Sequence, residues 1–155
     1  MNKSKGFTII ELLVVVAIIA VLAAIVLVNV TGYINQGKNA AIKGNAASIL
    51  TNAAVVYDAN GNYTDFCSTT VNPGLTYYKP ARDAIAAAFG AGSTQNCTVN
   101  GTDTAWCACA QLKVTSTETA TSYFCVDSLG TKKVYTGQAA AYCPTACPAA
   151  GACLQ

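Results

Sequence analysis

The chain contains no histidine, and charged residues make up only 10% of its 155 residues. Without histidine it lacks the commonest general base and the commonest metal ligand of proteins. Nine lysines and arginines stand against seven aspartates and glutamates, a net charge of +2. This balance provides no basic field to hold a nucleic acid. The composition therefore argues against a cytosolic enzyme and against direct nucleic-acid binding.

The apolar residues are concentrated in one segment near the N-terminus. Every residue from Leu12 to Val28 is Leu, Val, Ala or Ile. Together with residues 7–11, this segment extends about 33 Å as a helix, at about 1.5 Å per residue. The hydrocarbon core of a bilayer is about 30 Å thick. The sequence therefore predicts a membrane-spanning helix.

Three interpretations of this apolar segment compete. A secretory signal peptide has a shorter apolar stretch of about 7–15 residues and a small-residue cleavage site, and no good site follows here. A plain membrane anchor fits the length, but it explains Glu11 only if the carboxylate stays close to the headgroups. In the third interpretation, Glu11 is functional and meets a positive partner.

The residues before the apolar run favour this third interpretation. Residues 1–6 form a short basic leader, MNKSKG, and residues 7–13 continue as FTIIELL. The string resembles the prepilin leader and junction of type IV pilins and related pseudopilins, with Gly6, Phe7 and Glu11 at the family's spacing. The resemblance implies a leader peptide at 1–6, a transmembrane and assembly helix at 7–30, and an extracytoplasmic globular domain at 31–155.

The resemblance also assigns roles to three residues. A prepilin peptidase would cut between Gly6 and Phe7 and then methylate the new amine of Phe7. In a filament, the Glu11 carboxylate would pair with the Phe7 ammonium of a neighbouring subunit. An intrachain contact is the other possibility, since Phe7 and Glu11 are one helical turn apart.

A family member of this kind is a structural subunit and not an enzyme, with no cofactor and no metal. The resemblance implies a precursor in the inner membrane and then an extracellular pilus that serves adhesion, twitching motility or DNA uptake. The implied partners are copies of the chain in a helical homopolymer, the inner membrane, prepilin peptidase and the pilus assembly machinery. The alternatives are a pseudopilin or minor pilin of a type II secretion or competence system, and a membrane-tethered binding or enzymatic domain.

Past the apolar run the helix is expected to continue and become amphipathic, so that one helix runs from about Thr8 to Tyr57. Apolar residues recur there at spacings of four and three, which is typical of a helix with one buried face. These residues are Ile42, Ala46, Ile49, Ala53 and Val56. A second, short helix is expected from Pro80 to Phe89, because proline suits a first helical turn.

Further along, the apolar period changes to two. This alternation predicts three antiparallel strands, over residues 106–114, 123–127 and 132–136. Residues 62–104 are expected to be a connecting region with little strand pattern. Packing of the strands on the apolar stripe of the long helix gives an α+β fold with a small antiparallel sheet.

All eight cysteines follow the apolar run, and their number is even. In a chain exported across the membrane, this predicts a disulfide framework. The favoured pairs are Cys67 with Cys97, inside the connecting region, and Cys109 with Cys125, across two strands. The remaining four are expected to pin the C-terminal tail over the outer face or the edge of the sheet: Cys107, Cys143, Cys147 and Cys153.

Two other uses of the cysteines, and one of the carboxylates, remain open from the sequence. Zinc could be held at Cys107 and Cys109 or at Cys143 and Cys147, although neither pair has the spacing of a zinc ribbon. A catalytic thiol would lack a histidine partner. A calcium site is the remaining alternative for the scattered carboxylates, which are Asp58, Asp65, Asp83, Asp103 and Asp127.

Overall fold

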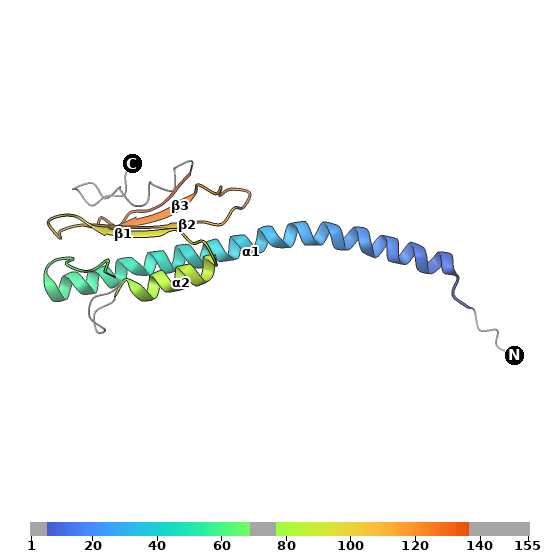
Figure 1. Ribbon diagram of the computed structural model, residues 1–155, viewed down its shortest axis with the longest axis horizontal. Helices are drawn as coiled ribbons and strands as arrows, with labels where there is room; N and C mark the ends of the chain where they lie inside the picture. The colour runs from blue at the N-terminus through green and yellow to red at the C-terminus, as the bar shows by residue number, and fades with distance from the viewer. Residues whose placement is uncertain (1–5, 69–76, 137–155) are drawn as a thin grey trace. The chain divides into compact units, whose positions relative to one another are not determined.

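The computed structural model describes residues 6–68 and 77–136 and, in order, two helices and four strands (Figure 1). The chain divides into two compact units, with the boundary after Ile34, so the first helix contributes to both. The elements are α1 (Ile9–Asn60), α2 (Lys79–Phe89), β1 (Gln95–Val99), β2 (Trp106–Gln111), β3 (Tyr123–Asp127) and β4 (Lys132–Tyr135).

Helix α1 ends at Asn60, immediately before a glycine. Gly61 has a φ of +71°, a left-handed conformation that favours glycine, and its N–H donates to the Tyr57 carbonyl at 2.8 Å. This arrangement satisfies one of the last carbonyls of the helix. Helix α2 has Pro80 in its first turn and ends at Gly90, as the sequence predicts.

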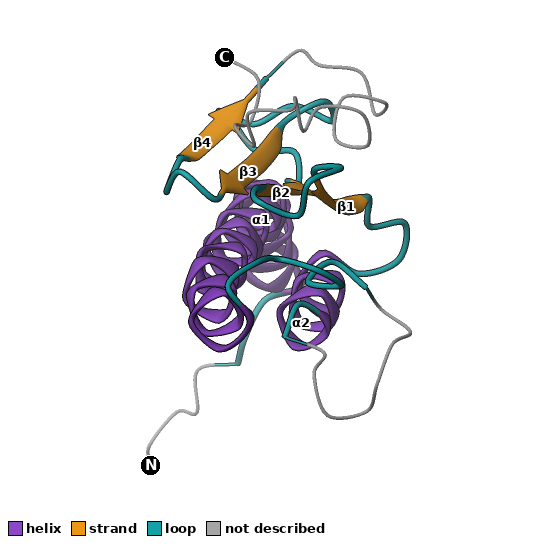
Figure 2. Ribbon diagram, turned by 90° about the vertical axis from the view of Figure 1, so that its left-hand side faces the viewer, coloured by secondary structure: helices purple, strands orange, loops and turns teal. Residues whose placement is uncertain are grey.

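The four strands form one antiparallel sheet in the order β1-β2-β3-β4. Both α2 and the part of α1 in the globular unit lie on one side of this sheet (Figure 2). The register pairs Cys109 with Cys125 across β2 and β3, and Phe124 with Val134 across β3 and β4. The α+β fold with a small antiparallel sheet is therefore confirmed.

The core lies between α1, α2 and the inner face of the sheet. The predicted stripe on α1 is buried throughout, from Ile42 to Val56, and it shares one core with Trp106 and Val126. Cys107, Tyr123 and Cys125 belong to a separate cluster. The inner and outer faces that the period of two predicts for the strand residues are therefore confirmed.

The prediction for residues 62–104 was wrong in one respect. Strand β1 lies within this region and pairs with β2 along its whole length, from Gln95 with Ala110 to Val99 with Trp106. Its sequence, QNCTV, is too polar to show an apolar alternation. Hydrogen bonding to β2 determines this strand, and that pairing is not visible in the local pattern.

A row of polar side chains on α1 holds the segment that follows β2. The Asn39 side chain donates from Nδ2 to the Lys113 carbonyl at 2.8 Å and accepts from the Lys113 N–H at 2.7 Å. One turn earlier, Asn35 Nδ2 donates to the Val114 carbonyl at 2.9 Å. Asn39 is only 2% exposed, and its amide satisfies partly buried backbone groups of Lys113.

The same row ends in an ion pair. Lys43 Nζ lies 2.8 Å from Glu118 Oε1. Hydrogen bonds from the Lys43 ammonium and then from the Thr115 and Thr117 hydroxyls lower the pKa of Glu118 to about 2. These bonds favour the ionised carboxylate and outweigh its partial burial.

Candidate functional site at the N-terminus of α1

The predicted processing site lies just before α1. Gly6, Phe7 and Thr8 are exposed and have no regular secondary structure. The Phe7 side chain is 76% exposed. The bond between Gly6 and Phe7 therefore lies outside α1, in exposed chain without regular secondary structure.

The Glu11 side chain closes the first turn of α1. Its Oε2 accepts the Thr8 backbone N–H at 2.9 Å and the Thr8 hydroxyl at 2.8 Å. The Glu11 N–H in turn points to Thr8 Oγ1 at 3.3 Å. This reciprocal arrangement is a capping box, with Thr8 at the N-cap and Glu11 three residues on. A negative side chain in the first turn is also favoured by the helix dipole.

Phe7 is the intrachain partner of Glu11 expected from the sequence, whereas in the structure Glu11 bonds to Thr8. A signal for it was present, because Thr8 and Glu11 form the pattern Thr-x-x-Glu directly before an apolar run. The carboxylate thus has partners within its own chain. Its negative charge is still unneutralised by these bonds, since both donors belong to neutral groups.

The helix that follows exposes its apolar side chains on all sides. Every side chain from Ile9 to Leu27 is exposed, including Ile9 at 81% and Leu27 at 70%. Soluble monomers rarely expose contiguous apolar patches of more than a few hundred Å². Helix α1 is also long and apolar enough to cross a membrane. This surface therefore requires lipid or other protein around it.

The apolar surface is hollowed along one side. A groove of about 350 Å³ is lined by side chains at helical spacing, with Ala17 as the small residue among larger ones. Ridges of one helix pack into such grooves of another. The groove is lined by Val14, Ala17, Ile18, Val21 and Leu22.

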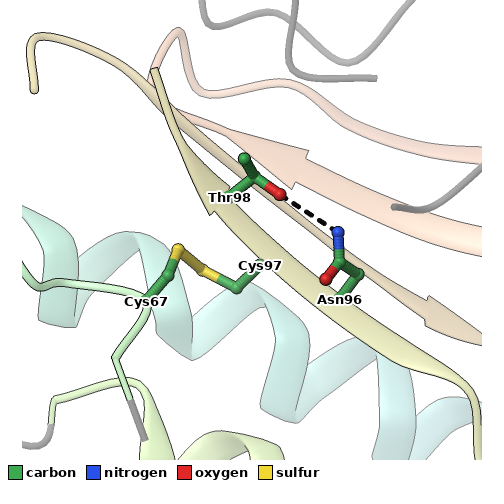
Figure 3. The surroundings of a disulfide bond; sticks show 4 residues. All are labelled: Cys67, Asn96, Cys97 and Thr98. Atoms are coloured by element: carbon green, nitrogen blue, oxygen red, sulfur yellow. Dashed lines mark hydrogen bonds between the residues drawn. A yellow bond between two sulfur atoms is a disulfide. The ribbon is translucent and has the colours of Figure 1, made fainter. Parts of the chain in front are cut away.

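The globular unit contains both disulfides predicted from the sequence. Cys67 bonds Cys97, with Cα atoms 5.3 Å apart, and joins the segment after α1 to β1 (Figure 3). On the outer side of the same strand, Asn96 Nδ2 donates to Thr98 Oγ1 at 3.0 Å. The disulfide thus holds β1 to the layer of helices, because Cys97 is on the inner face of its strand.

The second disulfide joins two neighbouring strands. Cys109 and Cys125 are register partners on β2 and β3, with Cα atoms 4.1 Å apart. Cys107 is also disulfide-bonded. The described cysteines are therefore all oxidised, which contradicts zinc binding at Cys107 and Cys109. Cys143, Cys147 and Cys153 lie outside the described residues, and so does the predicted pinning of the tail.

The carboxylates do not gather into a cation site in the part of the chain that the structure describes. Asp83 pairs with Lys79 and Arg82, and these hydrogen bonds lower its pKa. Asp127 is fully buried and accepts the backbone N–H groups of Leu129 and Thr131. Their contacts thus assign Asp83 and Asp127 to structural roles.

Comparison with known proteins locates the resemblance in the N-terminal part of the chain. The family model of the prokaryotic N-terminal methylation motif matches residues 1–27. These residues contain Gly6, Phe7, Thr8 and Glu11, together with most of the exposed apolar part of α1. No solved structure matches the chain.

Two curated relatives are type IV pilins. The type IV major pilin protein PilA of Myxococcus xanthus is 35% identical over 66 residues, which are 43% of this chain. The type IV major alpha-pilin of Moraxella bovis is 46% identical over 48 residues, which are 31% of this chain. Each match spans 30% of the relative's length. Over part of its length the chain is thus similar to two type IV pilins, and it carries the N-terminal methylation motif.

Proposed function

We propose that the chain is a structural, non-enzymatic subunit of a type IV pilus, assembled into a helical filament through α1. The observation that carries this proposal is the exposed apolar half of α1, which has the methylation motif at its start. Lipid can cover this surface before assembly, and the same surface of other copies can cover it afterwards. The apolar groove around Ala17 offers a complementary shape for such helix packing.

Processing prepares this helix for assembly. Prepilin peptidase cuts between Gly6 and Phe7 and methylates the amine of Phe7. The cut removes Lys3 and Lys5, so the side chains keep equal numbers of positive and negative charges. Without its cytoplasmic cations the anchor leaves the inner membrane more easily, and the assembly machinery adds it to the pilus on the cell surface.

Glu11 then sets the register between subunits. A carboxylate in the water-poor core of a filament is costly unless a charge pairs with it. The Thr8 groups hydrogen-bond Oε2 but supply no positive charge. The Phe7 ammonium of a neighbouring subunit supplies that charge. Packings that leave either charge alone are disfavoured, so the pair selects one register.

Two single substitutions separate this role from helix capping. Glu11→Gln removes the charge and keeps an oxygen that can accept from Thr8, because glutamine also serves in a capping box. Thr8→Ala removes the hydroxyl and keeps the carboxylate. We expect E11Q to be exported and processed normally but to reduce surface fibres by on the order of tenfold or more, since it leaves a buried ammonium unpaired. We expect T8A to form nearly normal amounts of fibres.

Fibres sheared from the cells are quantified against the total processed subunit, which separates assembly from export. Normal fibre yield in E11Q would remove the assigned role of Glu11. A defect in T8A as large as that in E11Q would show that capping, and not charge, is what assembly requires.

The alternative is a pseudopilin or minor pilin of a type II secretion or competence system. The methylation motif at residues 1–27 suits it equally, because it concerns the anchor and not the globular unit. The two proposals differ in the composition of the product. A major pilin makes up the bulk of long surface fibres, whereas a pseudopilin or minor pilin does not. Adhesion, twitching motility and DNA uptake are the proposed uses of the fibre.

A further inference from the structure

The exposed apolar part of α1 lies between two polar-tipped side chains of different kinds. After Glu11 the sequence has no charged residue until Lys38, and the only aromatic residue of this uncharged stretch is Tyr33. Tyr33 follows Glu11 by 22 residues, which is about 33 Å along a helix at about 1.5 Å per residue. The hydrocarbon core of a bilayer is about 30 Å thick. The two side chains are therefore spaced to lie at opposite surfaces of a bilayer.

The part of α1 that the globular unit covers begins just after Tyr33. Asn35 is the first residue of that unit, and its Nδ2 donates to the Val114 carbonyl at 2.9 Å. Before this point the large apolar side chains are exposed, and Tyr33 and Ile34 are the last of them, at 71% and 51%. Tyr33 thus lies at the end of the surface that requires lipid or other protein around it.

A tyrosine at this position suits the headgroup region of a bilayer. Its ring is apolar and its hydroxyl is polar, and such side chains are enriched where hydrocarbon meets water. Side chains on a helix tilt towards its N-terminus, so the Tyr33 ring covers the turn that precedes it, at the end of the apolar stretch. In that turn the Thr31 hydroxyl donates to the Leu27 carbonyl at 3.4 Å, as a hydroxyl next to hydrocarbon does. The exposed Tyr33 hydroxyl is left to bond with the oxygens of lipid headgroups.

We propose that Tyr33 anchors α1 at one surface of a phospholipid bilayer, with its ring among the upper acyl chains and its hydroxyl donating to headgroup or ester oxygens. Glu11 then lies at the opposite surface, where water hydrates its carboxylate and the hydrogen bonds with Thr8 are kept. Hydrocarbon covers α1 between these two side chains. The inference rests on the membrane-bound precursor of the proposed function and names the lipid contact that sets its depth.

Depth in the bilayer is measured by quenching of tryptophan fluorescence with brominated lipids. The full chain with Tyr33→Trp or Leu22→Trp is reconstituted in phosphatidylcholine vesicles brominated either near the headgroup or near the acyl-chain end. Leu22 is exposed and lies midway between Glu11 and Tyr33. The signal of the unsubstituted chain, whose one tryptophan is Trp106, is subtracted. We expect the shallow label to quench Y33W and the deep label to quench L22W more strongly, each by roughly twofold or more, because the two sites differ in depth by about 15 Å.

Two alanine substitutions in the L22W chain test whether Tyr33 sets this depth. Tyr33→Ala removes the phenol, so the helix can slide or tilt and the L22W indole moves away from the middle of the bilayer. We expect the ratio of shallow to deep quenching of L22W to rise. Ile34→Ala is the matched control, because Ile34 is the neighbouring exposed residue and has no polar tip, and it should leave the ratio unchanged. Circular dichroism of both variants verifies that the fold is retained.

Four results would overturn the proposal. Stronger quenching of Y33W by the deep label would place this position in the hydrocarbon. Quenching of L22W but not of Y33W would place it in water. A quenching ratio of L22W that Y33A leaves unchanged, or that I34A raises equally, would show that the phenol does not set the depth. Quenching of L22W by neither label would show that α1 does not enter the bilayer, and only this last result also contradicts the membrane-bound precursor.

Discussion

The side-chain amide of Asn39 hydrogen-bonds both the N–H and the C=O of Lys113, as the backbone of a neighbouring strand would. Both Lys113 groups bond to this one amide, at 2.7 and 2.8 Å, from a residue 74 positions earlier in the chain. The local sequence around Asn39 gives no sign of this contact. A polar residue beside a stripe of apolar ones reads as a solvent-facing position, whereas here it is buried.

Replacement of Asn39 by alanine should therefore destabilise the globular unit. The substitution leaves the partly buried N–H and C=O of Lys113 without their Asn39 partner, and we expect a loss of about 2–4 kcal/mol in the free energy of unfolding. Asn35→Ala is the matched control, because it removes one bond at a more exposed position and should cost less than about 1 kcal/mol. Denaturant unfolding of the full chain measures both, and equal effects would contradict this role.

The Lys43–Glu118 pair predicts a pH dependence. Glu118 has a pKa of about 2 in the folded chain, against a usual value of 4.5. Its contribution to stability is complete above pH 4.5 and is lost as the pH falls towards 2. The contribution is at most about 3 kcal/mol, and solvent around Lys43 reduces it. Glu118→Gln should flatten the stability profile in this window, measured by thermal unfolding between those pH values. An unchanged acid slope in E118Q would contradict the assignment.

At the scale of elements, the Cys67–Cys97 disulfide joins β1 to the segment that follows α1. It closes a loop with a sequence separation of 30, against 16 for Cys109–Cys125. The double substitution Cys67→Ser and Cys97→Ser should lower the free energy of unfolding by about 3–4 kcal/mol, and the corresponding change at Cys109 and Cys125 by about 3 kcal/mol. Denaturant midpoints of the two variants measure the losses. An unchanged midpoint in the first variant would mean that β1 is held by β2 alone.

The elements differ in how far their own residues determine them. The stripe from Ile42 to Val56 and the alternation after Trp106 were sufficient to predict α1, three of the four strands and their buried faces. Strand β1 could not be predicted in this way, because QNCTV has no apolar face of its own and depends on β2. The capping box was predictable from Thr8 and Glu11, which are only three residues apart. The Asn39 contact was not, because it joins distant segments.

At the scale of the whole molecule, the chain contains two units that require different surroundings. The unit from Asn35 onward has its own core and disulfides. The unit that ends at Ile34 exposes the apolar side chains of α1 and has no core of its own among the described residues. A protein of this composition is stable only where lipid or further copies surround the first unit. The proposed filament meets this need, and the capping box shows that the start of the helix is already formed in the single chain.

Electron microscopy of material sheared from the cell surface, with the subunit identified by mass spectrometry, tests this account most directly. The account predicts long fibres composed of this chain, each copy beginning at Phe7 and heavier by one methyl group. Dispersed monomers that still begin at Met1, with no fibre containing the chain, would contradict it.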